Sequence, residues 1–246
     1  MKQALSIPSA YNAESSSKFS RIVLNQPHAS IEGLYNPLLS YWDIDERFLN
    51  EVVVKWTDWH TDFLFHRVQS ECVRTVRFPY SRFIVDAERL WDDPLEEEGQ
   101  GIVYKRFADY TRYVPQSAQR CLEYLWKSHQ AQLSLQLRPD ALLLDCHSFP
   151  SDLSDVDICI GWNEDWSKPN LQVIEAVANR FDDYGYKVGL NTPYSNSMTP
   201  SCDFQYKSMM IEVNKKTYLK PHSIELLTQG NRLSDVMASV IEELSV

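Results

Sequence analysis

The tetrapeptide Asp145-Cys146-His147-Ser148 places a carboxylate, an imidazole and a hydroxyl together at the end of an apolar run. That run, residues 141–144, is short enough to form a buried strand. Ligands of open α/β sheets bind just outside the carboxyl ends of strands, so this position predicts a functional site. The alternative is that Asp145 and His147 only cap the strand and satisfy each other.

Polar side chains also stand at the other predicted strands. They are His28 after the first strand, Asp58, His60 and Asp62 after the second, and Glu212 within the last. Two imidazoles, a carboxylate and a water are a ligand set that suits zinc. Ligands from separate strands share no fixed spacing, so the indication rests on residue type. An ordinary hydrogen-bonded or surface histidine is the alternative for each imidazole.

Two arginines point to an anionic ligand. Arg82 and Arg89 lie around a predicted junction between a strand and a loop. Arginine is the preferred residue for bidentate recognition of a carboxylate. The alternative is a pair of surface salt bridges to Asp86 or Glu88, which would carry little energy.

Five cysteines stand at positions 72, 121, 146, 159 and 202, an odd number without Cys-x-x-Cys spacing. We expect reduced thiols in a cytoplasmic protein. Cys146 adjoins the candidate site, but on a strand its side chain points away from Asp145 and His147. We therefore expect Cys146 to pack in the core rather than to act as a nucleophile.

The elements that must position these residues alternate between strands and helices. Strands are expected at residues 21–26, 51–55, 72–76, 141–145, 156–160, 186–190 and 208–213, and a strand or extended segment at 81–86. Helices are expected after Thr57, over 107–137 with a break at Pro115, over 169–183 and over 233–244. This order favours one α/β domain over residues 21–246, a three-layer sandwich with a mixed, largely parallel sheet flanked by helices. Residues 1–20 are expected to be a loosely structured lead-in.

Composition narrows the classes of partner. The chain has 246 residues and a formal net charge of −10, which argues against nucleic acid as the main partner. Residues 1–20 lack the apolar core of a signal peptide, and no apolar stretch reaches the roughly 18 to 20 residues of a membrane helix. These features favour a cytoplasmic protein that does not bind membranes, and they leave its oligomeric state open.

Six motifs in order resemble the N-formylglutamate amidohydrolase family, which is similar to the zinc carboxypeptidases and the succinylglutamate desuccinylases. The motifs are Pro27-His28, Thr61-Asp62-Phe63-Leu64-Phe65, Ser81-Arg82 with Asp86 and Arg89, Leu144-Asp145-Cys146-His147-Ser148, Asn191-Thr192-Pro193-Tyr194 and Ile211-Glu212-Val213. The resemblance covers about residues 22–219. It implies a fold like that of the zinc carboxypeptidases and phosphorylase/hydrolase proteins, a divalent metal, and hydrolysis of an amide beside a carboxylate.

The resemblance also implies roles for single residues at the metal. His28, Asp62 and His147 would be its ligands, and Asp145 would be the partner that orients His147. The metal would be zinc, manganese or iron, because imidazole and carboxylate ligands suit all three.

The remaining roles concern the substrate, a small carboxylated amide such as an N-formyl or other N-acyl amino acid. Glu212 and Arg89 would be catalytic, with Glu212 as the general base that takes a proton from water and returns it to the leaving amine. The residues expected to bind the substrate are Arg82, Arg89, Asn191 and Tyr194.

The chain departs from the family's motifs at three places. Ser30 stands where the family has a glycine, Glu88 replaces an asparagine, and Ser195-Asn196-Ser197 replaces a glycine pair. Glycine permits close backbone approach and positive φ, so these changes should reshape the pocket and leave the metal site in place. A carboxylate at position 88 should partly neutralise Arg89 and disfavour a substrate with two negative charges.

Two other functions are compatible with these residues. One is a non-catalytic or peptidase-like protein whose metal cleft binds a carboxylated ligand or a peptide. The presence of Glu212 favours the enzyme, because a binding protein needs no base beside the metal. The other is a hydrolase with Cys146 as nucleophile, which requires that thiol to face the cleft.

Overall fold

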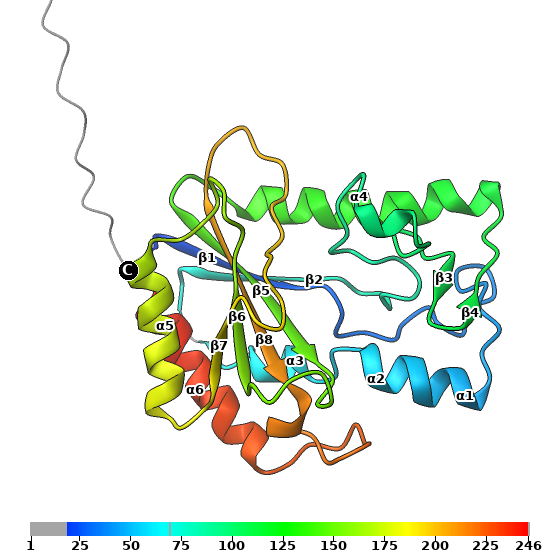
Figure 1. Cartoon of the computed structure of the whole chain (residues 1–246). Helices are drawn as coiled ribbons and strands as arrows, with labels where there is room; N and C mark the ends of the chain where they lie inside the picture. Colours follow the sequence, from blue (N-terminus) through cyan, green and yellow to red (C-terminus); the bar gives the residue numbers. More distant parts are fainter. Residues whose placement is uncertain (1–18, 69, 246) are drawn as a thin grey trace, which may run out of the picture.

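A computed structural model describes residues 19–68 and 70–245, and its centre is a six-stranded sheet (Figure 1). The predicted lead-in falls almost wholly outside the described residues. In spatial order the strands are β2 (Val73–Arg77), β1 (Arg21–Gln26), β5 (Ala141–Phe149), β8 (Lys207–Asn214), β6 (Ile158–Gly161) and β7 (Val188–Leu190). The mixed α/β sheet expected from the sequence is therefore confirmed.

The strand β5 lies in the middle of the sheet, and its nine residues are all buried. It pairs in parallel with β1 on one side and with β8 on the other, whereas β6 pairs antiparallel with β8. A strand covered on both faces needs a continuous run of apolar residues, which residues 141–144 provide. The register sets Asn25 beside Asp145 and His147 beside Glu212, so polar residues meet at the carboxyl ends.

Helices cover both faces of the sheet. The described helices are α1 (Glu46–Phe48), α2 (Val54–Trp56), α3 (Thr61–Leu64), α4 (Gln116–Gln136), α5 (Leu171–Asp183) and α6 (Gln229–Glu243), with a π-helical segment η1 (Leu49–Val53) and 3-10 turns η2 (Pro94–Glu96) and η3 (Lys215–Thr217). Figure 1 shows α4 on one side of the sheet and α5 and α6 on the other. Within residues 19–68 and 70–245, no helix is both long and apolar enough to cross a membrane.

Alternation along β5 decides which side chains meet which layer. Leu142, Leu144 and Cys146 belong to the main core with α5 and α6, whereas Ala141 and Leu143 pack with residues of α4. Successive side chains of a strand point to opposite faces. Asp145 and His147 therefore lie on the α4 face, and Cys146 is fully buried on the other, as predicted.

Two expected strands are not strands. Residues 51–55 belong to a continuous helical stretch, because Phe48, Val52 and Val53 recur at helical spacing and bury one face in an aromatic cluster. Residues 81–86 form a turn in which the Ser81 carbonyl accepts hydrogen bonds from the amides of residues 84 and 85. Local hydrogen bonds thus replace a ladder in both segments.

Of the helix expected over 107–137 with a break at Pro115, only the part after the break is helical. It begins at Gln116, directly after Pro115 at its N-cap position. The preceding residues form a small hairpin of β3 (Arg106–Phe107) and β4 (Tyr110–Thr111) instead. Ala108 adopts φ 49° between these strands, a conformation that a continuous right-handed helix excludes.

Shortening a core side chain of β5 should destabilise the protein. Leu144 is fully buried, so we expect Leu144→Ala to lower the free energy of unfolding by about 2 to 5 kcal/mol, through lost burial and a cavity. Leu135 on α4 is 78% exposed, and Leu135→Ala should change it by less than about 0.5 kcal/mol. Urea denaturation of both variants checks this; equal losses would contradict the described core.

Candidate functional site

The carboxyl ends of three neighbouring strands bring the candidate residues together. His28 follows β1 by two residues, His147 lies near the end of β5, and Glu212 lies opposite it in β8. All three side chains are buried, with at most 8% of each residue exposed. Residues from distant parts of the chain therefore lie together at one edge of the sheet.

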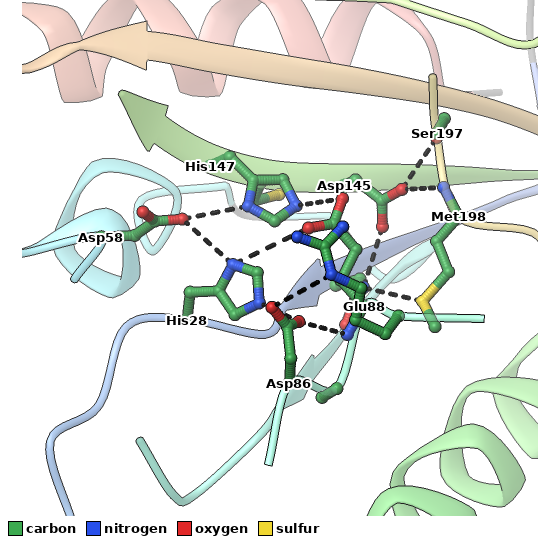
Figure 2. A network of polar contacts seen from close by, with 12 residues as sticks. His28, Asp58, Asp86, Glu88, Asp145, His147, Ser197 and Met198 are labelled. Atoms are coloured by element: carbon green, nitrogen blue, oxygen red, sulfur yellow. Dashed lines mark hydrogen bonds and ion pairs between the residues drawn. The ribbon is translucent and has the colours of Figure 1, made fainter. Parts of the chain in front are cut away.

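Asp58 supplies the carboxylate of the candidate metal site. Its Oδ2 lies 3.0 Å from Nδ1 of His147 and 3.7 Å from Nδ1 of His28. Figure 2 shows both imidazoles turned toward this carboxylate. The Asp58 amide donates to the His28 carbonyl at 3.1 Å, which fixes the segment after α2 beside β1. His28, Asp58 and His147 are close enough together to hold one metal ion.

The hydrogen bonds of His28 leave a nitrogen free for a metal. Its Nε2 lies 2.7 Å from Oδ1 of Asp86, a fully buried carboxylate. Burial tends to raise the pKa of Asp86, but the charges of His28, Arg82 and Arg89 hold that pKa well below its usual range. An ionised carboxylate only accepts, so Nε2 donates and the buried Nδ1 is left without a hydrogen-bond partner. This donor set fits a divalent metal, since a histidine ligand commonly gives its outer N–H to a carboxylate.

Glu88 lies against the same two histidines. Its carboxylate oxygens are 3.3 Å from Nε2 of His147 and 3.8 Å from Nδ1 of His28. Burial acts against the charged carboxylate, but the charge of His147 and its hydrogen bond lower the pKa of Glu88 to about 2. The expected partner of Glu88 was Arg89; the ion pairs of Arg89 instead run to Asp86 and Asp93.

The many acidic neighbours decide the charge of His147. Burial lowers the pKa of an imidazole, but Glu88 and the hydrogen bond to Asp58 raise the pKa of His147 well above its usual value. The pKa of Asp58 is lowered, because the hydrogen bond with His147 and the proximity of both histidines outweigh the effect of burial. His147 is therefore held in its cationic form by the carboxylates around it, and a bound metal cation could take the place of that proton.

The assignment of Asp62 as a metal ligand is wrong. Its carboxylate forms an ion pair of 2.7 Å with Arg77 on β2, and its side chain is 36% exposed. Asp58 occupies the expected place of the acidic ligand. The useful signal was the position of Asp58 immediately after the helical segment 46–56, where the chain turns in beside β1. His60 is not a ligand either, since its Nε2 contacts the Ile224 carbonyl at 2.8 Å.

Asp145 does not orient His147. Its carboxylate accepts hydrogen bonds from Asn25 at 2.8 Å, from the Ser197 hydroxyl at 2.8 Å and from the Met198 amide. These contacts tie the 191–206 loop to β1 and β5. Burial raises the pKa of Asp145, which is why it needs several donors.

A histidine that sequence reasoning missed completes this buried network. Nε2 of His129 on α4 lies 2.8 Å from Oδ1 of Asn25, whose amide nitrogen donates to Asp145. Burial lowers the pKa of His129 to about 4, so it is neutral at pH 7 and donates to Asn25. The helical spacing of α4 marks a buried face, but it gives no sign that an imidazole lies on it.

A cavity of about 390 Å³ opens beside the metal cluster. Its polar lining includes Asp58, Arg82, Glu88, Arg89, His147, Tyr194, Asn196 and Glu212. The remaining walls include the apolar residues Trp56, Phe107, Pro150 and Met210. A concave site with apolar walls and a few convergent polar groups is typical of a small-molecule site.

Glu212 has the environment of a proton acceptor. Its Oε2 is buried and has no hydrogen-bond partner within the described residues. Burial raises its pKa to about 8, with further increases from the charges of Asp58 and Glu88. A carboxylate whose pKa lies near neutrality can both take and return a proton.

The two predicted substrate arginines both reach the cavity, but their surroundings differ. Arg82 donates to Asp86 at 3.0 Å, to the Tyr104 hydroxyl at 3.2 Å and to the Trp56 carbonyl at 3.5 Å. Arg89 comes no closer to a carboxylate than 3.7 Å, the distance to Asp86. The turn of residues 81–86 therefore links both arginines to Asp86, the carboxylate that contacts Nε2 of His28.

Of the two predicted residues from the 191–206 loop, only Tyr194 lines the cavity. The side chain of Asn191 instead accepts a hydrogen bond from the Trp162 amide at 2.9 Å, at the end of β6. Asn191 adopts φ 49°, a left-handed conformation that asparagine tolerates better than most residues. The prediction that Asn191 binds the substrate is therefore corrected, because its side chain holds the loop instead.

A larger cavity of about 690 Å³ shares Pro150 with the first cavity. None of the histidines and carboxylates of the metal cluster lines it. Its lysines include Lys55 and Lys220, which already pair with Asp152 and Glu225. Volume alone would favour this cavity. The arrangement of titratable groups instead favours the smaller one as the reaction site.

Comparison with known proteins finds a matching protein family and similar solved structures. The family model for N-formylglutamate amidohydrolase matches residues 20–219. No curated protein matches the chain. A crystal structure of N-formylglutamate amidohydrolase from Ralstonia eutropha is similar over 94% of each chain, with a TM-score of 0.74 and 16% identity.

Two further solved structures are similar. A gene product of Agrobacterium tumefaciens has a TM-score of 0.56 and 13% identity, over 93% of this chain and 91% of that one. Murine aminoacylase 3 has a TM-score of 0.38 and 12% identity, over 94% of this chain and 66% of that one. At such identities the two bacterial structures establish a shared fold.

Substitutions at Asp58 and Asp62 should affect metal affinity differently. Asp58→Asn removes a charged donor from the cluster, so we expect zinc or manganese affinity to fall by more than about tenfold. Asp62→Asn alters only an exposed ion pair and should bind metal like the wild type. Titration calorimetry with each metal measures both. Loss of metal in Asp62→Asn but not in Asp58→Asn would refute the revised ligand set.

Proposed function

The chain belongs to the N-formylglutamate amidohydrolase family, and from this we propose that it is a metal-dependent hydrolase of N-formyl or other N-acyl amino acids. The observation that carries the proposal is the position of Glu212 in one cavity with Asp58 and His147, two members of the metal cluster that His28 completes, with its buried Oε2 unpartnered within the described residues. Metal ligands alone would serve a binding protein. A buried base beside them serves water activation.

The residues present would hold a divalent cation through His28, Asp58 and His147. Zinc is the first choice for this set, with manganese and iron as alternatives. When bound, such a cation supplies Lewis acidity, which polarises a carbonyl and lowers the pKa of water. Asp86 would fix the orientation and tautomer of His28 during turnover.

Glu212 would move the protons of the reaction. It takes one proton from the attacking water, whose oxygen forms a bond to the acyl carbon. It then gives this proton to the amide nitrogen as the C–N bond breaks, so that a free amine leaves. Products are the carboxylate of the acyl group and an amino acid. No enzyme-bound acyl intermediate is needed.

Arg89 would hold the carboxylate of the substrate, and Tyr194 would line the same side of the cavity. Arg82 would act mainly through its contacts with Asp86 and Tyr104. A cysteine mechanism is not supported, since the Cys146 thiol is fully buried in the core and burial raises its pKa well above the usual value. The five free cysteines favour a reducing compartment, so we also propose a cytoplasmic location.

Replacement of the base should separate catalysis from metal binding. We expect Glu212→Gln to keep its metal and to lose at least about 100-fold in kcat, the usual contribution of general acid–base catalysis. The measurements are metal content and hydrolysis rates with a panel of N-formyl and N-acetyl amino acids.

Glu225→Gln is the matched control, because Glu225 forms an exposed ion pair with Lys220. It should retain wild-type rates. A Glu212→Gln rate within about threefold of the wild type would show that Glu212 is not the base. A metal-loaded wild type that binds but never hydrolyses these compounds would favour the binding function.

A further inference from the structure

The cations available in the catalytic cavity limit the charge of its ligand. Arg82 and Arg89 are the only lysine or arginine side chains that line it in the described part of the chain. Asp58, Glu88 and Glu212 line the same space, and Asp86 lies directly behind it. Away from the metal and its histidines, each anionic group of a ligand must therefore find one of two guanidiniums in a cavity rich in carboxylates.

Arg82 has few donors left for a ligand. One of its terminal nitrogens donates to both Asp86 and Tyr104, and the other faces the Trp56 carbonyl. Its side chain is only 13% exposed. Taking Arg82 away from Asp86 would leave a buried carboxylate with fewer partners, which is costly.

Arg89 is the guanidinium that remains open. Its side chain forms no hydrogen bond within residues 19–68 and 70–245, and its Nε is buried without a partner. The nearest carboxylate oxygens, from Asp86 and Asp93, lie at 3.7 and 3.9 Å. One planar guanidinium can bind one carboxylate through two parallel hydrogen bonds.

Part of the cavity wall is apolar and suits an apolar side chain of the ligand. Trp56 and Phe107 form an edge-to-face pair with ring centroids 5.7 Å apart, and Met210 and Pro150 add to the lining. A second carboxylate on the ligand would meet these side chains, the charged carboxylate of Glu88, or neutral polar groups such as Gln100 and Asn196. None of them carries the positive charge that would compensate its desolvation.

We propose that this site selects N-acyl amino acids that carry one carboxylate and an uncharged, apolar side chain, and that it discriminates against dicarboxylates such as N-formylglutamate. The proposal rests on the proposed function for the reaction itself. Arg89 binds the α-carboxylate, and the wall of Trp56, Phe107 and Met210 receives the side chain. Glu88 contributes to the discrimination through its charge inside the cavity, although it pairs with the histidines rather than with Arg89.

Three substrates of nearly equal length test the selection: N-formyl-L-glutamate, N-formyl-L-glutamine and N-formyl-L-norleucine. We expect kcat/KM to be highest for norleucine and at least about tenfold lower for glutamate than for glutamine, which differs from it only in charge. A value for glutamate equal to or above that of glutamine would overturn the proposal.

Equilibrium binding separates this proposal from the proposed reaction. Zinc-loaded Glu212→Gln protein is titrated with the same three compounds by calorimetry. Weaker binding of glutamate than of glutamine supports the selection even if the wild type hydrolyses none of them, in which case only the proposed reaction fails. Equal binding of the two, or no binding of any, overturns the selection.

A change at Gln100 tests the charge argument directly. Gln100 lines the cavity and does not belong to the metal cluster. Gln100→Lys adds a cation and should raise the glutamate-to-glutamine ratio of kcat/KM at least about fivefold, whereas Gln100→Met should leave the ratio unchanged. A folded Gln100→Lys protein with the wild-type ratio would show that cavity charge does not set the preference.

Discussion

The rest of the site depends on the contacts of the buried Asp86 carboxylate. It accepts from His28, Arg82 and Tyr104 and also faces Arg89, so one buried group connects the metal cluster to the substrate side of the cavity. An ionised group at this depth is tolerated only because donors surround it. The acids of the cluster, Asp58 and Glu88, then leave an excess of negative charge. A proton on His147 partly offsets that excess, and a divalent cation would offset it more fully.

The parts of the site that follow from regular structure could be predicted from the sequence. An apolar run of four residues indicated a buried central strand, and period-two alternation placed His147 on the site face and Cys146 in the core. Parallel pairing then brings Glu212 beside His147. The chain order of six motifs indicated the family, which the match over residues 20–219 confirms. Helix α5 followed from the start signals Ser167 and Pro169, and α6 from its apolar periodicity.

The parts that depend on irregular backbone could not be predicted in the same way. Asp58 and Asp62 are four residues apart, and only the path of the chain after α2 decides that one faces the histidines while the other meets Arg77. Residues 81–86 have the composition of a strand, yet local turns serve to aim Arg82 and Asp86 at the cavity. The contacts of Asp145 with Asn25 and Met198 span more than 50 residues along the chain and leave no local signature.

The elements that carry the cavity divide its residues into two groups. His147 and Glu212 stand on the central strands β5 and β8. Arg89, Gln100 and Phe107 lie in the segment between β2 and α4, which does not belong to the six-stranded sheet. Sequence drift in that segment can alter what is recognised without disturbing the strands. The chemistry and the choice of compound can therefore diverge at separate rates among descendants of one ancestral gene. For laboratory evolution, a library over residues 90–108 that keeps Tyr104 would sample new substrates while sparing the sheet and the contacts of Asp86.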